Sequence, residues 1–214
     1  MIVGSRAKPQ IPPVDVGVYP SVCVGVVDLG EQEMTFKNKT HYSNRVKIIF
    51  ELPGELIDVD GEQLPRQLSR NFTISASTKS SIRQFVGAWL GKTFSDADFE
   101  NFDLKDLLDR PALLNVVHSE DGQYANIASA MSMPKGIPAP KRIGELLYFD
   151  TQEWDDATFD AMPEYLQEQL KKSSVYRDAH LPDQEVSVDA ANAEAAKREE
   201  DFKEVNIPKG ACPF

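Results

Sequence analysis

The stretch FKNKTHYSNRVK, residues 36–47, interleaves aromatic and basic side chains. Cationic side chains can neutralise the phosphates of a nucleic acid strand, and exposed aromatic rings offer flat faces on which bases stack. We therefore predict that this stretch contacts a single strand of nucleic acid. The predicted contact residues are Phe36, Lys37, Lys39, Tyr42, Arg45 and Lys47.

Four residues outside this stretch extend the predicted surface. Tyr19 falls in the outward-facing phase of an apolar segment, and Tyr124 follows a turn. Arg70 and Lys79 add positive charge. Structural alternatives stay open, because lysines at sheet edges also block unwanted strand pairing and a tyrosine can lay its ring against a sheet.

Side chains that would support catalysis are sparse. The histidines His41, His118 and His180 are far apart, and none has the spacing of a metal ligand. The sequence contains neither a glycine-rich phosphate loop nor a serine elbow motif. The acidic stretch at residues 95–109 lacks the glycine of an EF-hand and is typical of a solvated helix surface. We predict no enzymatic activity, no cofactor and no metal site.

Three segments in the first half alternate apolar and polar residues, which is the pattern of half-buried strands. They span residues 16–30, 43–53 and 66–75. In the first segment the valines at even positions share one face and Tyr19 lies on the other. In the second segment Lys47 lies opposite the apolar face. We expect the apolar faces to be buried, and Tyr19 and Lys47 to point outward.

Two helices are predicted after the third strand. Residues 77–94 carry apolar side chains at helical spacing, with Ser77 or Thr78 as the N-cap and Gly91 as the stop. Residues 95–111 are predicted to form a second, short helix. The large side chains in the apolar phases are expected in the core: Phe50, Phe72, Phe85 and Trp89.

Residues 112–134 are predicted to form a β-hairpin, because two apolar runs flank the turn signal Asp121-Gly122. The resulting order is three strands, a helical region and two strands. This is the order of the OB-fold, a five-stranded Greek-key barrel with a helix between its third and fourth strands. Other small barrels stay open as alternatives. We predict a mainly β protein with helices, built as an OB-fold with a helical and disordered C-terminal extension.

The chain divides into four predicted regions. The regions are a flexible arm at 1–14, an OB-fold nucleic-acid-binding domain at 15–143, an extended and helical extension at 144–177, and an acidic disordered tail at 178–214. The two cysteines, Cys23 and Cys212, have no disulfide or zinc-site spacing and are predicted to be free thiols. No apolar run is long enough for a bilayer and no signal pattern opens the chain, so a cytoplasmic location is expected.

Acidic residues are concentrated in the last third of the chain. Residues 1–143 contain 16 Lys and Arg against 17 Asp and Glu, whereas residues 144–214 contain 7 against 17. An acidic tail can occupy a positive binding face until nucleic acid displaces it. The tail ends in Pro213 and Phe214, which we predict to be bound by a partner protein.

Four stretches resemble the bacteriophage OB-fold single-stranded-DNA-binding proteins. These stretches are GVYPSVCVGVVDLGEQ, VKIIFELP, LLNVVHSEDGQYANIASAMSMPKGIPAP and YFDTQEWD, which span most of residues 16–155. The ending IPKGACPF is similar to the tails of bacterial single-stranded-DNA-binding proteins, except that Lys209 interrupts the acidity. The resemblance implies sequence-independent coating of single-stranded DNA during phage replication or recombination in the host cytoplasm. It also implies replication or recombination proteins as tail partners, and no catalytic residues.

Two other functions stay open at this stage. The same surface could serve a phage accessory or anti-host protein that binds another protein and no nucleic acid. A nuclease that uses carboxylates and a divalent ion is the third alternative. The aromatic and cationic stretch favours the nucleic-acid binder, because a protein-binding barrel has no need of it. The sequence leaves open the preference for DNA or RNA and the oligomeric state, including a homo-oligomer.

Overall fold

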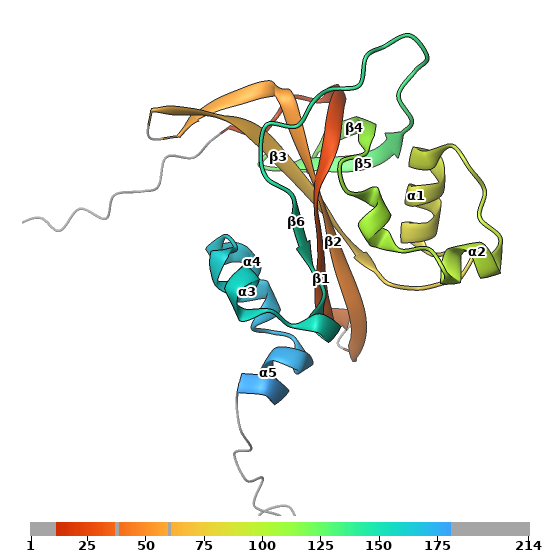
Figure 1. Cartoon of the computed structure of the whole chain (residues 1–214), viewed down its shortest axis with the longest axis vertical. Coiled ribbons are helices and arrows are strands. Elements are labelled where there is room, and N and C mark those ends of the chain that lie inside the picture. The colour runs from red at the N-terminus through yellow and green to blue at the C-terminus, as the bar shows by residue number, and fades with distance from the viewer. Residues whose placement is uncertain (1–11, 37–38, 60, 181–214) are drawn as a thin grey trace, which may run out of the picture. The chain divides into compact units, whose positions relative to one another are not determined.

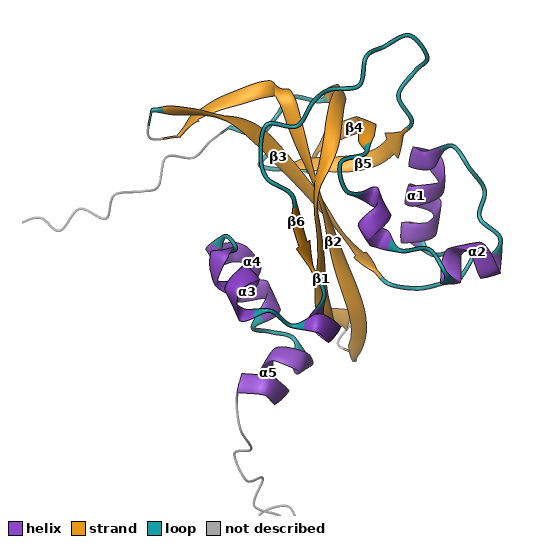
Figure 2. Cartoon of the chain, in the orientation of Figure 1, coloured by secondary structure: helices purple, strands orange, loops and turns teal. Residues whose placement is uncertain are grey.

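The protein is mainly β, with several short helices (Figure 1, Figure 2). The computed structural model describes residues 12–36, 39–59 and 61–180. The chain separates into one unit that ends at Val175 and a second that begins at Tyr176. The fold and the sites below belong to the first unit.

Six strands form one sheet with the order β3-β2-β1-β4-β5, and β6 pairs with β1. Neighbouring strands are antiparallel, except that β6 runs parallel to β1. The predicted succession of three strands, a helical region and a hairpin is confirmed. The strands are β1 (Gly17–Phe36), β2 (Lys39–Val59), β3 (Glu62–Thr73), β4 (Pro111–His118), β5 (Ala125–Met131) and β6 (Leu147–Phe149).

Strands β1 and β2 extend further than the alternation predicted. They form a long two-stranded ribbon in which Tyr42 pairs with Glu33, so most of residues 31–42, which lie between the first two predicted strands, is strand. Register shifts at Cys23/Gly25 and Asp28/Gly30 mark bulges, which bend a strand. The first part of β1 therefore pairs with β4 and a later part pairs with β6.

The bulges also change which side chains of β1 reach the core. Val16 and Val18 are 61% and 54% exposed, although we predicted them to be buried. Tyr19, predicted to face outward, packs against the core, and its hydroxyl donates to the Asp15 carbonyl oxygen at 3.0 Å. After the first bulge the phase inverts and Val26 enters the core. A single alternation over residues 16–30 was wrong because one extra residue moves later side chains to the other face.

Helix α1 (Ser81–Leu90) supplies much of the core. Its buried side chains meet those of β2 and β3, with ring centroids 5.0 Å apart for Phe50 and Trp89 and 4.8 Å apart for Phe72 and Phe85. All four predicted core aromatics are therefore confirmed. The indole N–H of Trp89 donates to the Pro111 carbonyl oxygen at 2.8 Å, which gives the one polar atom of this large side chain a partner.

The ends of the helices follow local capping signals. The N-cap of α1 is Ser80 and not Ser77 or Thr78, and Gly91 ends the helix in the left-handed conformation, as predicted. The second predicted helix is two shorter ones, α2 (Asp96–Glu100) and the 3-10 helix η1 (Leu104–Leu107). The hairpin between β4 and β5 turns at Gly122, whose positive φ of 68° suits glycine.

Residues 144–175, named the extension here, lie on the opposite side of the sheet from α1 and α2 (Figure 1). Rings of Phe149, Trp154 and Phe159 form a cluster there, with neighbouring centroids 5.0 and 5.1 Å apart. Helix α5 reaches three residues into the stretch predicted to be disordered, and the rest of that stretch lies outside the described residues. The elements after β6 are η2 (Thr151–Glu153), α3 (Asp156–Ala161), α4 (Glu164–Leu170) and α5 (Ser174–His180).

Candidate nucleic-acid interface

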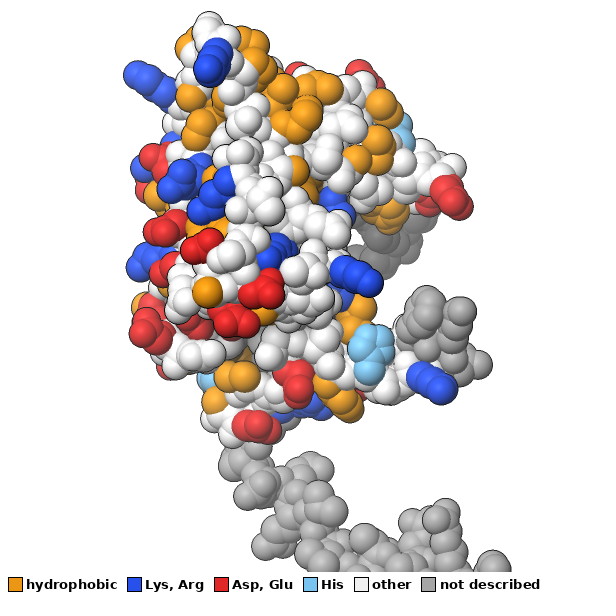
Figure 3. Space-filling view, turned by 90° about the vertical axis from the view of Figure 1, so that its right-hand side faces the viewer, with side chains coloured by type: hydrophobic (Ala, Val, Ile, Leu, Met, Phe, Trp, Pro, Cys, Tyr) orange, Lys and Arg blue, Asp and Glu red, His pale blue; other side chains and the backbone are white. Residues whose placement is uncertain are grey.

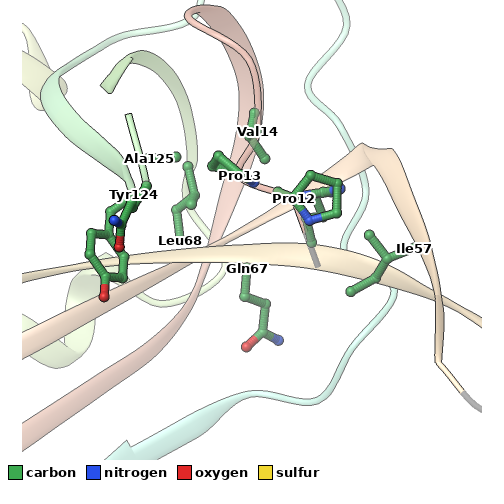
Figure 4. A pocket seen from close by; sticks show the side chains of 10 residues that line it. Pro12, Pro13, Val14, Ile57, Gln67, Leu68, Tyr124 and Ala125 are labelled. Atoms are coloured by element: carbon green, nitrogen blue, oxygen red, sulfur yellow. The ribbon is translucent and has the colours of Figure 1, made fainter. Parts of the chain in front are cut away.

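A hollow of about 800 Å³ lies between β3 and the β4–β5 hairpin, and we name it the β3–β5 groove. In Figure 4, Tyr124 stands at one side of it and Pro12 and Ile57 at the other. The floor includes the apolar side chains of Leu68 and Ala125. The full lining is Pro12, Pro13, Val14, Ile57, Arg66, Gln67, Leu68, Gln123, Tyr124 and Ala125.

Tyr124 is 64% exposed at the edge of this groove, and the hairpin fixes its backbone. Its N–H donates to Ser119 Oγ at 3.0 Å, and its carbonyl oxygen accepts from the Ser119 N–H at 2.9 Å. The Asp121 carboxylate accepts from the Ser119 hydroxyl and the Gln123 N–H, which holds the pKa of Asp121 below its usual range. The ring therefore extends from a rigid turn, as a platform for a stacked base requires.

Arg66 and two glutamines supply the polar groups of the groove. Arg66 Nη1 donates to the Pro12 carbonyl oxygen at 2.5 Å, so a positive charge is fixed at the wall. The amides of Gln67 and Gln123 can each donate and accept hydrogen bonds, as the edge of a base requires. The groove thus combines an aromatic face, a cation and amides above an apolar floor.

The segment before β1 forms one wall of the groove and is tied to the sheet. His118 Nε2 and the Val14 carbonyl oxygen lie 2.8 Å apart. The Tyr19 hydroxyl donates to the Asp15 carbonyl oxygen, as described above. Desolvation, and secondarily the nearby carboxylate of Glu55, raises the pKa of Tyr19. Tyr19 therefore supports the wall, and its ring does not lie on the outer face where we predicted it.

The predicted ribbon residues lie far from this groove. Ile57 lies fifteen positions after Tyr42 on β2, a path of roughly 50 Å along the strand. Tyr42 and Lys39 are exposed, and the Arg45 guanidinium donates to the sulfur of Met34 at 3.0 Å. The structure thus does not gather the ribbon residues and Tyr124 into one compact site. Lys37 and the side chain of Phe36 lie outside the described residues.

Lys47, which we predicted to face outward, is only 5% exposed, because the extension covers it. Its ammonium lies 5.6 Å from the centroid of the Tyr165 ring of α4. Four positions further along β2, the fully buried carboxylate of Glu51 accepts from the N–H groups of Ile143 and Gly144 at 2.5 and 2.8 Å. Burial, and secondarily Arg45, lowers the pKa of Lys47. In this structure Lys47 cannot reach a phosphate.

Arg70 is also engaged within the protein. Its guanidinium donates to the carbonyl oxygens of Ile127 and Ala128 on β5, at 2.9 and 2.7 Å. It lies 5.1 and 5.3 Å from the ring centroids of Phe72 and Phe85. Arg70 therefore joins the two edges of the sheet, which is a structural role that its sequence context did not indicate.

The remaining predicted residues are less informative. Lys79 is exposed just before α1. On the face that Figure 3 shows, which carries α1 and α2, basic and acidic side chains are interspersed. Pro213 and Phe214 lie outside the described residues. Within the described ranges, no three His, Cys, Asp or Glu side chains gather as a metal would need.

Sequence reasoning missed Arg66, Gln67, Gln123 and Pro12 as members of the groove. Arg66 shares the alternation phase of Leu68, which turns toward the core, so the pattern gave no sign that its charge borders a hollow. In the part of the chain that the structure describes, no helix combines the length and apolar character needed to cross a membrane. Comparison of the chain with protein-family models, curated proteins and solved structures finds no match.

Proposed function

We propose that this protein binds single-stranded DNA without sequence preference, and that it acts in phage DNA replication or recombination in the host cytoplasm. The observation that carries the proposal is that the exposed ring of Tyr124 and the charge of Arg66 both line the β3–β5 groove. A base stacked on such a ring contributes about 1–3 kcal/mol, and every base has a face that can stack. The groove therefore suits a ligand whose sequence varies.

The strand order supports an OB-type barrel as the framework. In the order β3-β2-β1-β4-β5, strands β3 and β5 are the two ends, and Arg70 connects them. Helix α1 lies between β3 and β4 in the chain, where an OB-fold has its helix. The hairpin that carries Tyr124 joins β4 to β5, and that loop is one of the two that OB-folds use for oligonucleotides.

Fluorescence anisotropy with the full chain tests this proposal. Labelled oligo-dT, a duplex of the same length and an RNA strand are titrated at low and high salt. We expect binding that favours the single strand and weakens with salt, because cations released from the phosphates drive part of the association. Absence of binding to all three probes at low salt, also after removal of residues 178–214, would refute the proposal.

A second candidate function, a protein-interaction module, is favoured by one observation. The outer face of β1, β4 and β5 carries the exposed apolar side chains of Val18, Val117 and Met131. Exposed apolar patches commonly mark protein contacts. If the anisotropy titration shows no binding, this face becomes the first surface to mutate.

A further inference from the structure

A second hollow, of about 530 Å³, separates the outer face of β1 and β2 from α3 and α4. We name it the extension groove. Its floor contains Val24 and Ile49, and its sides include the partly exposed apolar side chains of Leu146 and Tyr165. An occupant of this groove must therefore bring apolar side chains.

The segment that borders the extension groove carries only negative charge, and the Lys47 ammonium, 5.6 Å from the ring centroid of Tyr165, is buried. Residues 144–170 contain eight Asp and Glu and no Lys or Arg. Glu145 lines the groove itself, and Glu164 and Glu168 are exposed on α4. Complementary charge selects partners at a surface, so the occupant must be basic as well as apolar, and a nucleic acid strand is repelled.

The two grooves meet at Gln67, which lines both. In Figure 4 the side chains of Leu68 and Gln67 leave opposite faces of β3, and Pro12 lies beside them. Arg66, the residue before Gln67, holds Pro12 at the wall of the β3–β5 groove, so the chain that precedes Pro12 starts beside β3, the strand that carries Gln67. Eleven extended residues span at most roughly 36 Å, which is enough to enter a neighbouring hollow.

We propose that residues 1–11 of this chain, the arm, dock in its own extension groove. The arm contains Arg6 and Lys8 and no acidic residue, and its apolar residues include Ile2 and Val3. It therefore has both properties that the groove selects. In this arrangement the apolar side chains contact the floor, and the two basic side chains face the carboxylates of the extension. The proposal does not depend on nucleic-acid binding.

A photo-cross-linker tests the proposal in the full-length protein. Val3 is replaced by benzoylphenylalanine, the sample is irradiated, and the linked peptides are mapped by mass spectrometry. We expect links within one chain, to Ile49 or to residues 146–166. Charge reversal by Glu145→Lys should lower the yield about threefold, as should high salt. The matched control is Glu100→Lys, which reverses an exposed charge on α2 and should leave the yield unchanged.

Competition with a free peptide distinguishes the arm from other possible occupants of the extension groove. An excess of a synthetic peptide of residues 1–11 should abolish the cross-link. Equal competition by a scrambled peptide of the same composition would overturn the proposal and assign the groove to basic segments in general. The proposal would also be overturned by links between two chains, by links outside the groove, or by a cross-linking yield that Glu145→Lys leaves unchanged.

Discussion

The guanidinium of Arg70 on β3 donates a hydrogen bond to the carbonyl oxygen of Ile127 on β5 at 2.9 Å. Among the described residues, no backbone ladder joins these two strands. A single side chain therefore takes the place of the hydrogen bonds that would otherwise connect the edges of the sheet. Because its planar group also lies over Phe72 and Phe85, the bridge depends on the shape of arginine and not on charge alone.

Replacement of Arg70 should destabilise the fold. We expect Arg70→Ala to lose about 2–3 kcal/mol of unfolding free energy, since the carbonyl oxygens of Ile127 and Ala128 lose a charged donor. Arg70→Lys should lie between this variant and the wild type, because lysine lacks the planar fork. Urea unfolding measures both, with Lys79→Ala as an exposed control. Equal stability of Arg70→Ala and Lys79→Ala would contradict the bridging role.

Removal of the Tyr124 ring should weaken binding to oligo-dT. The expected loss for Tyr124→Ala is about 1–3 kcal/mol, the contribution of one stacked base, whereas Tyr124→Phe keeps the ring and most of the affinity. Anisotropy titration at low salt gives the values. Tyr42→Ala reports separately on the ribbon. Weaker binding by Tyr42→Ala together with unchanged binding by Tyr124→Ala would move the contact away from the β3–β5 groove.

Substitution of Lys47 should affect stability before it affects binding. Lys47→Glu places a carboxylate beneath α4, away from water, and should destabilise the protein by about 2 kcal/mol. The pKa of Lys47 is lowered below 10.5 in the folded state, so its charged form costs stability at neutral pH, and this cost fades as the pH rises toward 10.5.

The neutral variant Lys47→Met removes the buried charge, so its stability relative to the wild type measures the cost of burying the ammonium. Its stability advantage over the wild type, measured by urea unfolding, should shrink between roughly pH 7 and pH 10. A difference that stays constant over this interval would show that Lys47 is not desolvated.

The thiol of Cys23 should be inert in the folded protein. Burial raises its pKa to about 12, and its side chain is fully buried. In a Cys212→Ser background, we expect no reaction with a thiol reagent near pH 8 until denaturant is added, because the thiolate is the reactive form. Stoichiometric labelling of the native protein within minutes would contradict this placement.

Deletion of residues 178–214 should tighten binding to single strands at low salt. We expect the acidic stretch to compete with the phosphates for the same cations, and this competition should weaken as salt screens it. Comparison of both forms at two salt concentrations measures the effect. Identical affinities at low salt would show that the tail does not compete.

The core and the hairpin were predictable because they depend on short-range patterns. The alternation around Phe50, the helical spacing up to Trp89 and the turn at Gly122 each arise from residues close in sequence. The same patterns placed the large aromatic side chains in the core, where the structure has them. Which face of a strand or helix is buried is thus determined by residues that are close in sequence.

The candidate site was not predictable in this way, because it depends on contacts between distant residues. Lys47 has an outward phase, and only the return of the extension over β2 covers it. Arg70 has the sequence context of a surface cation, and its use as a bridge requires that β5 lie beside β3. Tyr124 was predicted, but Arg66 and Gln67 line the same groove only because β3 and β5, the two ends of the sheet, lie near each other.

The two tryptophans of the sequence lie in separate parts of this architecture. Trp89, on α1, has its side chain buried in the core, whereas Trp154 belongs to the aromatic cluster of the extension. Intrinsic fluorescence consequently contains two signals with different origins. With Trp154→Phe the emission reports on the core, and with Trp89→Phe it reports on whether the extension remains in place. The protein thus carries one optical reporter for each part, and release of the extension can be observed without an added label.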